Sequence, residues 1–202
     1  DASDEPDEIA ARLPPPGPLR MTGVSGEIRY ESGGFKADLK GLLEEFPYSV
    51  TLDYKGVSQN APFNCTLVSS GFVLGKHPQL FRFAKPIVAA RLNLFSEPTG
   101  IVDAEVTISR GPPVNGVAAE VAVGGVMRFH DTRAAFKRFP YEFRDMRGVV
   151  RFTDNEVLLE NVTGTAPSGA TVHATGRIAP LTADAGVDLD IVAHGIPIDD
   201  TL

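Results

Sequence analysis

Strict alternation of apolar and polar residues recurs along most of this chain and constrains its fold more than any other feature. A period of two places every second side chain on the same face of a β-strand, so each such segment has one dry face and one wet face. Turns such as Ser32-Gly33-Gly34 and Asp154-Asn155 separate the segments. The sequence therefore predicts a mainly antiparallel all-β protein of about eleven strands. The alternating segments are 26–30, 35–40, 50–54, 63–67, 102–108, 171–178 and 187–191.

Two places depart from the β pattern and are predicted to be helical. Within residues 78–95, Val88, Leu92 and Phe95 follow one another at the spacing of a single helix face. A second helical turn is predicted over 132–138, just before a Phe-Pro-Tyr sequence. We therefore expect one or two short helices, and we interpret 78–95 as a helical insert in the sheet.

The predicted strands have more apolar surface than one or two short helices can cover, so the sheet must fold on itself. One arrangement is a curled β-groove with an apolar floor, and the alternative is a closed β-sandwich. A β-barrel around some other small apolar ligand is a third arrangement. Alternation alone favours the filled sandwich, because inward apolar rows are usually a packed core.

The first 18 residues differ in composition from the rest of the chain. Five of the eight residues Asp1–Glu8 are acidic, and Leu13–Pro18 is rich in proline. Such a composition is typical of a stiff, solvated linker, so we assign 1–18 to an acidic, proline-rich linker and 19–202 to the β segment.

A repeat is visible within the β segment. Phe46-Pro47-Tyr48 and Phe139-Pro140-Tyr141 open two similar stretches, which stay in step as far as Ser70-Gly71 and Thr163-Gly164. Repeats of this kind indicate modules that lie side by side and bury one another's apolar faces. We expect repeat units at about 19–110 and 111–202, and because two copies are few, we interpret the chain as a fragment of a longer protein.

Charge and residue types argue against several classes of function. The chain has 19 Lys and Arg against 26 Asp and Glu, whereas a nucleic-acid binder needs a basic face. Cys65 is the single cysteine, so no internal disulfide can form. The four histidines show no metal-ligand or catalytic spacing. We therefore expect no enzyme activity, no metal, no cofactor and no nucleic-acid partner.

The C-terminal part carries a recognisable pattern. Gly148-Val149-Val150-Arg151-Phe152 is a Gly-apolar-x-aromatic strand, Val157–Gly164 reads apolar-x-apolar-x-Asn-apolar-x-Gly, and Gly176-Arg177-Ile178 closes the unit. Residues 187–199 add a Val-Asp strand followed by Ile-Pro-Ile-Asp. Together these segments resemble the C-terminal repeat of AsmA-like proteins, and Leu19–Gly71 is a weaker echo of it.

AsmA-like proteins, like the related TamB and the eukaryotic bridge-like lipid-transfer proteins, are repeating β-groove proteins. The resemblance implies a taco-shaped sheet whose hydrophobic floor carries phospholipid acyl chains across the periplasm of the bacterial cell envelope, in outer membrane biogenesis. It also implies an inner-membrane anchor outside this chain and further β-groove repeats as neighbours. The helical insert at 78–95 departs from the family pattern.

We expect inward apolar residues to line such a groove, with small residues such as Ala37, Ala104, Ala174 and Gly176 leaving room for an acyl chain. The alternative function is a structural or adhesive β-repeat module that has no ligand and whose inward rows pack on one another. The expected lining residues are Ile28, Tyr30, Leu39, Leu52, Phe63, Leu67, Val106, Ile108, Phe152, Val172, Leu189 and Ile191.

Overall fold

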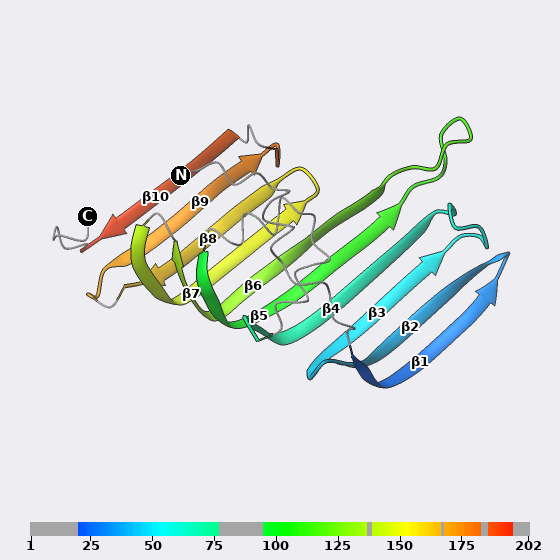
Figure 1. Cartoon of the computed structure of the whole chain (residues 1–202), viewed down its shortest axis with the longest axis horizontal. Helices are drawn as coiled ribbons and strands as arrows, with labels where there is room; N and C mark the ends of the chain where they lie inside the picture. Colours follow the sequence, from blue (N-terminus) through cyan, green and yellow to red (C-terminus); the bar gives the residue numbers. More distant parts are fainter. Residues whose placement is uncertain (1–19, 77–94, 137–138, 167, 183–185, 196–202) are drawn as a thin grey trace.

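Ten strands form a single antiparallel sheet, and each strand is hydrogen-bonded to the next one in the sequence (Figure 1). This architecture comes from a computed structural model, which describes residues 20–76, 95–136, 139–166, 168–182 and 186–195. The β1–β2 turn is built by Ser32 and Gly33, both at positive φ, as a two-residue hairpin requires. The strands are β1 (Met21–Glu31), β2 (Gly34–Leu43), β3 (Phe46–Tyr54), β4 (Phe63–Leu74), β5 (Phe95–Arg110), β6 (Val121–Phe136), β7 (Phe139–Thr153), β8 (Val157–Thr165), β9 (Thr171–Ala179) and β10 (Gly186–His194).

The all-β antiparallel prediction is confirmed, with ten strands in the described residues instead of about eleven. The closed sandwich and the barrel are both wrong. Because the strands pair strictly in sequence order, β1 and β10 lie at opposite edges of one open sheet (Figure 1). A sandwich would need the strands to divide between two sheets, and a barrel would need β1 to pair with β10.

The described residues contain no helix, and hence none long and apolar enough to cross a membrane. The helical turn predicted over 132–138 is wrong, since Thr132–Phe136 is the end of β6 and pairs with β7. Register shifts between Phe129 and Thr132 and again before Phe136 break the alternation there, so the sequence does not show the pattern of a regular strand. The insert predicted at 78–95 lies outside the described residues, apart from Phe95, which begins β5.

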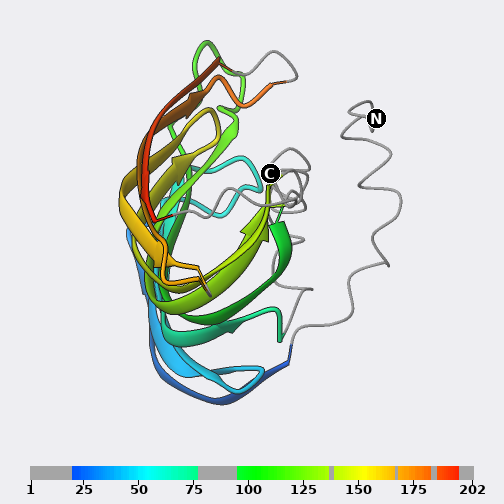
Figure 2. The same cartoon turned by 90° about the vertical axis from the view of Figure 1, so that its left-hand side faces the viewer.

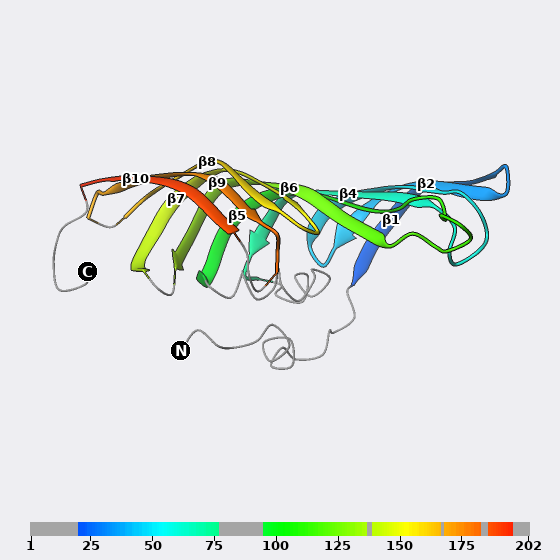
Figure 3. The ribbon, with the colours of Figure 1, turned by 90° about the horizontal axis from the view of Figure 1, so that it is seen from above.

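The sheet is strongly curved (Figure 2). Register shifts interrupt the ladders of adjacent strands, from β4 across to β9. A β-bulge bends its strand and increases the local twist, so bulges side by side bend a whole band of the sheet. Beyond the shifts, the ends of β5, β6 and β7 turn to the same side (Figure 3).

The two Phe-Pro-Tyr segments begin β3 and β7, but the strands that follow them differ. β3 has 9 residues and β7 has 15. Gly56 comes after the end of β3, whereas Gly148 lies inside β7 opposite Phe129. The similar stretches therefore enter the sheet in the same way and leave it at different points.

A small apolar core lies where the sheet bends. Phe46, Phe72, Leu74 and Val102 pack together, and Val102 is fully buried. The rings of Phe46 and Phe72 meet edge to face with their centroids 5.0 Å apart. Next to this core, a Cβ atom on Gly100 would lie 2.1 Å from the Asp131 carbonyl oxygen, so β5 and β6 can approach there only with glycine.

Replacing Val102 by alanine should lower the free energy of unfolding by about 2 kcal/mol, because two buried methyl groups are lost and a cavity remains. Urea denaturation followed by circular dichroism measures the change. Val57→Ala is the matched control, since Val57 is 82% exposed and its loss should be nearly neutral. Equal effects of the two substitutions would contradict this placement of the core.

Candidate functional site: the apolar face of the sheet

One face of the sheet carries an unbroken row of uncharged, apolar residues across all ten strands. The row is Gly26, Leu39, Val50, Leu67, Val106, Gly125, Phe152, Val157, Ile178 and Val187, each paired with the next across a strand boundary. Cross-strand partners in a ladder project from the same face, so these side chains form one continuous stripe.

Three further rows lie beside this stripe on the same face. The four rows together are called the apolar face below. One crosses β2–β10 as Gly41, Tyr48, Ser69, Ala104, Met127, Val150, Leu159, Gly176 and Leu189. The other two cross β1–β6 as Ile28, Ala37, Leu52, Cys65, Ile108 and Val123, and as Tyr30, Phe35, Tyr54, Phe63, Arg110 and Val121.

The opposite face is mostly polar, because the polar residues of the alternating pattern project from it. One of its rows reads Glu27, Asp38, Thr51, Thr66, Thr107, Gly124 and Thr153. Ion pairs lie across this face, for example Arg151 Nε to Glu160 Oε1 at 2.9 Å. They are solvent-exposed and so contribute little to stability.

The structure places every predicted lining residue on one side of the sheet. Ten of them belong to the four rows, and Val172 and Ile191 lie further along the same faces of β9 and β10. Most are half-buried, while Ile28 and Tyr30 at the edge are each 69% exposed. No second layer of described residues covers this face (Figure 2).

Two glycines of the apolar face, Gly125 and Gly176, are covered by neighbouring side chains. A Cβ atom on Gly125 would lie 2.7 Å from Cζ of Phe152, so the phenyl ring lies over the glycine. At Gly176 the corresponding contact is Leu189 Cδ2 at 2.9 Å. The room expected at Gly176 is therefore taken by Leu189.

A ladder of stacked aromatic rings lies along one rim of the apolar face. The ring centroids of Phe35 and Tyr54 are 5.0 Å apart, and those of Tyr54 and Phe63 are 5.8 Å apart, with both pairs nearly parallel. Arg110 Cζ lies 5.4 Å from the centroid of Phe63 and ends the ladder. Sequence reasoning missed Arg110, although it continues the alternation of Val106 and Ile108.

Cys65 lies on the apolar face between its cross-strand partners Leu52 and Ile108. Its side chain is half-buried, and this burial raises the pKa of the thiol. A thiol with a raised pKa is a poor nucleophile at neutral pH.

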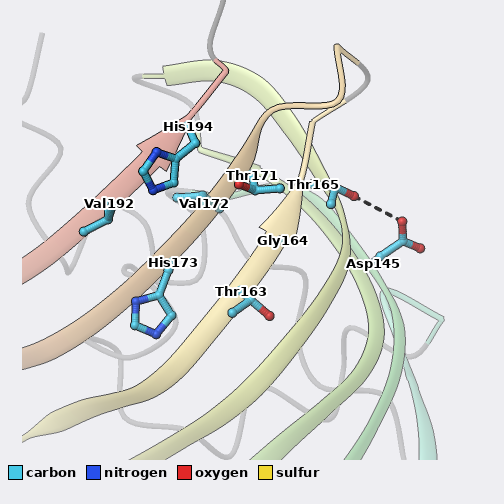
Figure 4. A pocket seen from close by; sticks show the side chains of 9 residues that line it. All are labelled: Asp145, Thr163, Gly164, Thr165, Thr171, Val172, His173, Val192 and His194. Atoms are coloured by element: carbon cyan, nitrogen blue, oxygen red, sulfur yellow. Dashed lines mark hydrogen bonds between the residues drawn. The ribbon is translucent and has the colours of Figure 1, made fainter.

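A shallow depression of about 510 Å³ lies at one end of β8–β10, lined mostly from the polar face (Figure 4). His173 and His194, far apart in sequence, come from adjacent strands there, and Thr165 Oγ1 donates to Asp145 Oδ2 at 3.1 Å. The described residues contain no cluster of three or more His, Cys, Asp or Glu that could hold a metal ion. The depression thus offers polar side chains without an arrangement for metal chemistry.

Asp103 connects three strands on the polar face at the bend. Its Oδ1 accepts the Gly71 N–H at 2.9 Å, and its Oδ2 lies 2.7 Å from His130 Nε2. The hydrogen bond from Gly71 and, next, that from His130 lower the pKa of the Asp103 carboxyl. These contacts tie the irregular region of β4 to that of β6 through β5.

No protein-family model, curated protein or solved structure matches this chain. The function of the apolar face must therefore be argued from its own geometry and chemistry.

Asp103→Asn should destabilise the fold by about 0.5 kcal/mol at neutral pH, a small effect because the pair is largely solvent-exposed. The folded-state pKa of Asp103 is lowered, so its stabilisation is complete above the unfolded pKa and is lost as pH falls through the folded value. Urea unfolding should show the difference between the wild type and Asp103→Asn disappearing as pH falls below the ordinary aspartate pKa of about 3.9. A difference that persists undiminished in strong acid would contradict this role.

Proposed function

We propose that this chain binds the acyl chains of phospholipid or another acyl-chain lipid on the apolar face of its sheet. The observation that carries the proposal is the row from Gly26 to Val187, which crosses all ten strands without a charged residue. A filled core would explain such a row if a second layer covered it, and no described residue does so.

The energetics suit an acyl ligand. Each methylene group removed from water contributes about 0.8 kcal/mol, so a sixteen-carbon chain gains roughly 12 kcal/mol from a dry surface. Ten strands at a spacing of about 4.8 Å make a floor about 43 Å across. One leaflet of a bilayer core is about 15 Å thick, so this floor is longer than a single acyl chain. A long, uncharged floor suits movement of lipid along it.

We further propose that the curvature of the sheet makes the apolar face the floor of a groove. The aligned bulges and the curved outline in Figure 2 support this. The resemblance of Phe139–Ile178 to the AsmA-like repeat supports lipid transport in the bacterial periplasm as the setting. Such a function requires a groove-shaped apolar surface from which water is excluded, and it requires no reactive group.

The two edge strands are suited to pair with further β-groove repeats of the same longer chain. Val187 on β10 and Ile28 on β1 are 60% and 69% exposed, so each edge presents apolar side chains beside unpaired backbone groups. Since the sheet has ten strands, a following module in the same orientation would continue the antiparallel alternation.

Placing two carboxylates on the floor by Leu67→Asp with Val106→Asp should weaken binding of a fluorescent fatty-acyl probe roughly tenfold or more, because burying unpaired charge is costly. These residues are cross-strand partners in the middle of the sheet. Titration of the purified chain, together with native mass spectrometry for co-purified lipid, measures the effect.

The matched control is Thr66→Asp with Thr107→Asp, the neighbouring cross-strand pair on the polar face of the same strands. It adds the same charge and should leave binding within about twofold. Equal loss in both variants, or a wild type that neither carries nor takes up lipid, would favour the structural or adhesive module instead.

Cys65 provides a second test with the native sequence. Its thiol lies within the apolar face, so a bound acyl chain should slow its labelling by maleimide severalfold, even at a pH where the thiolate forms. The rate of maleimide labelling is followed by mass spectrometry with and without a saturating fatty acid. An unchanged rate, while the probe is shown to bind, would place the ligand away from Leu52 and Ile108.

A further inference from the structure

Arg110 stands apart from every other residue of the apolar face. In the four rows of described residues that define this face, it is the one charged side chain. It sits at the end of β5, in the rim row, between Phe63 on β4 and Val121 on β6. A positive charge at the border of a wide uncharged surface is well placed to bind a negatively charged group.

The contacts of Arg110 hold its guanidinium in place on the rim. It stacks over the Phe63 ring, and Nη1 donates to the backbone carbonyl of Gln59. No ion pair joins it to a carboxylate in the part of the chain that the structure describes. A guanidinium has several N–H donors, so donors remain for an oxyanion after the bond to Gln59.

The aromatic ladder preorganises this position. Phe63 is stacked on Tyr54, which is stacked on Phe35, so the surface beneath the guanidinium is rigid. Arginine suits such a site because its planar group stacks on a ring and binds carboxylate or phosphate with two parallel hydrogen bonds.

An apolar path begins at Arg110. Ile108, Val106 and Ala104 follow it on the same face of β5, which gives about 20 Å of uncharged surface at the usual rise of a strand. This length accommodates an acyl chain whose polar end lies at the rim.

We propose that Arg110 binds the anionic head group of the ligand, a carboxylate or phosphate attached to an alkyl chain that lies on the apolar face. This inference rests on the proposed lipid-binding function. It narrows the ligand to anionic amphiphiles and places their head group beside Phe63.

The test compares Arg110→Gln with the wild type, using pairs of probes with the same sixteen-carbon chain, one anionic and one neutral. Hexadecanoate is paired with its methyl ester, and hexadecyl phosphate with hexadecanol. The wild type should bind each anion roughly tenfold more tightly than its neutral partner. Arg110→Gln should remove that preference by weakening the anions alone, and Arg110→Lys should restore part of it.

Arg29→Gln is the matched control, because Arg29 lies on the polar face and pairs with Glu27, and its loss changes the net charge equally. It should keep the wild-type preference. A larger preference for hexadecanoate over its methyl ester would indicate a fatty-acid carboxylate as the head group. A larger preference for hexadecyl phosphate over hexadecanol would indicate a phospholipid-type phosphate.

Other outcomes would overturn the assignment. Equal binding of anionic and neutral probes by the wild type, or equal weakening of both by Arg110→Gln, would make Arg110 a structural residue while lipid binding stands. If inorganic phosphate competed as strongly as hexadecyl phosphate, the alkyl chain would contribute nothing to binding, and the apolar face would not be part of this site. A wild type that binds none of the four probes would refute the proposed function itself.

Discussion

The hydrogen-bonded register of ten consecutive strands is the constraint on which the rest of the structure depends. A slip of one residue in a strand would move all of its side chains to the other face. The row from Gly26 to Val187 is continuous only because each of the nine strand pairings places the inward residue of one strand opposite the inward residue of the next. The register shifts fall farther along the strands, beyond the row, so they bend the sheet without breaking the stripe.

A single layer with one apolar face cannot satisfy that face by itself. In the described residues a cluster of buried apolar side chains lies at the bend, around Val102 and Phe72. Across the rest of the apolar face Ala37 and Tyr48 are also buried, but most side chains are half-buried or exposed, and water remains their neighbour until something else covers them. Under the proposed function, stability and ligand binding depend on different parts of the sheet: the ladders and the bend hold it together, while the middle of the face would bind the ligand.

The details of that face arise from pairs of residues distant in sequence. Phe152 lies over Gly125, and Leu189 covers Gly176, which closes gaps that small residues would leave. Phe35, Tyr54 and Phe63 stack because their register positions coincide on three adjacent strands. Arg110 ends this ladder, so one rim of the face has both aromatic surface and positive charge.

The alternation in the sequence predicted most of the strands and the face on which their side chains lie, because a period of two is a local property of the chain. The predicted lining residues, from Ile28 to Ile191, all fall on one side for that reason. The sequence could not determine whether the sheet stays open, closes on itself or divides into two layers, because an open meander, a barrel and a sandwich share the same alternation. The register shifts near Phe129 interrupt the alternation, so the strand over 132–136 was not recognised from the sequence. The register that stacks Arg110 on Phe63 depends on pairing between strands, and no single segment of the sequence contains those contacts.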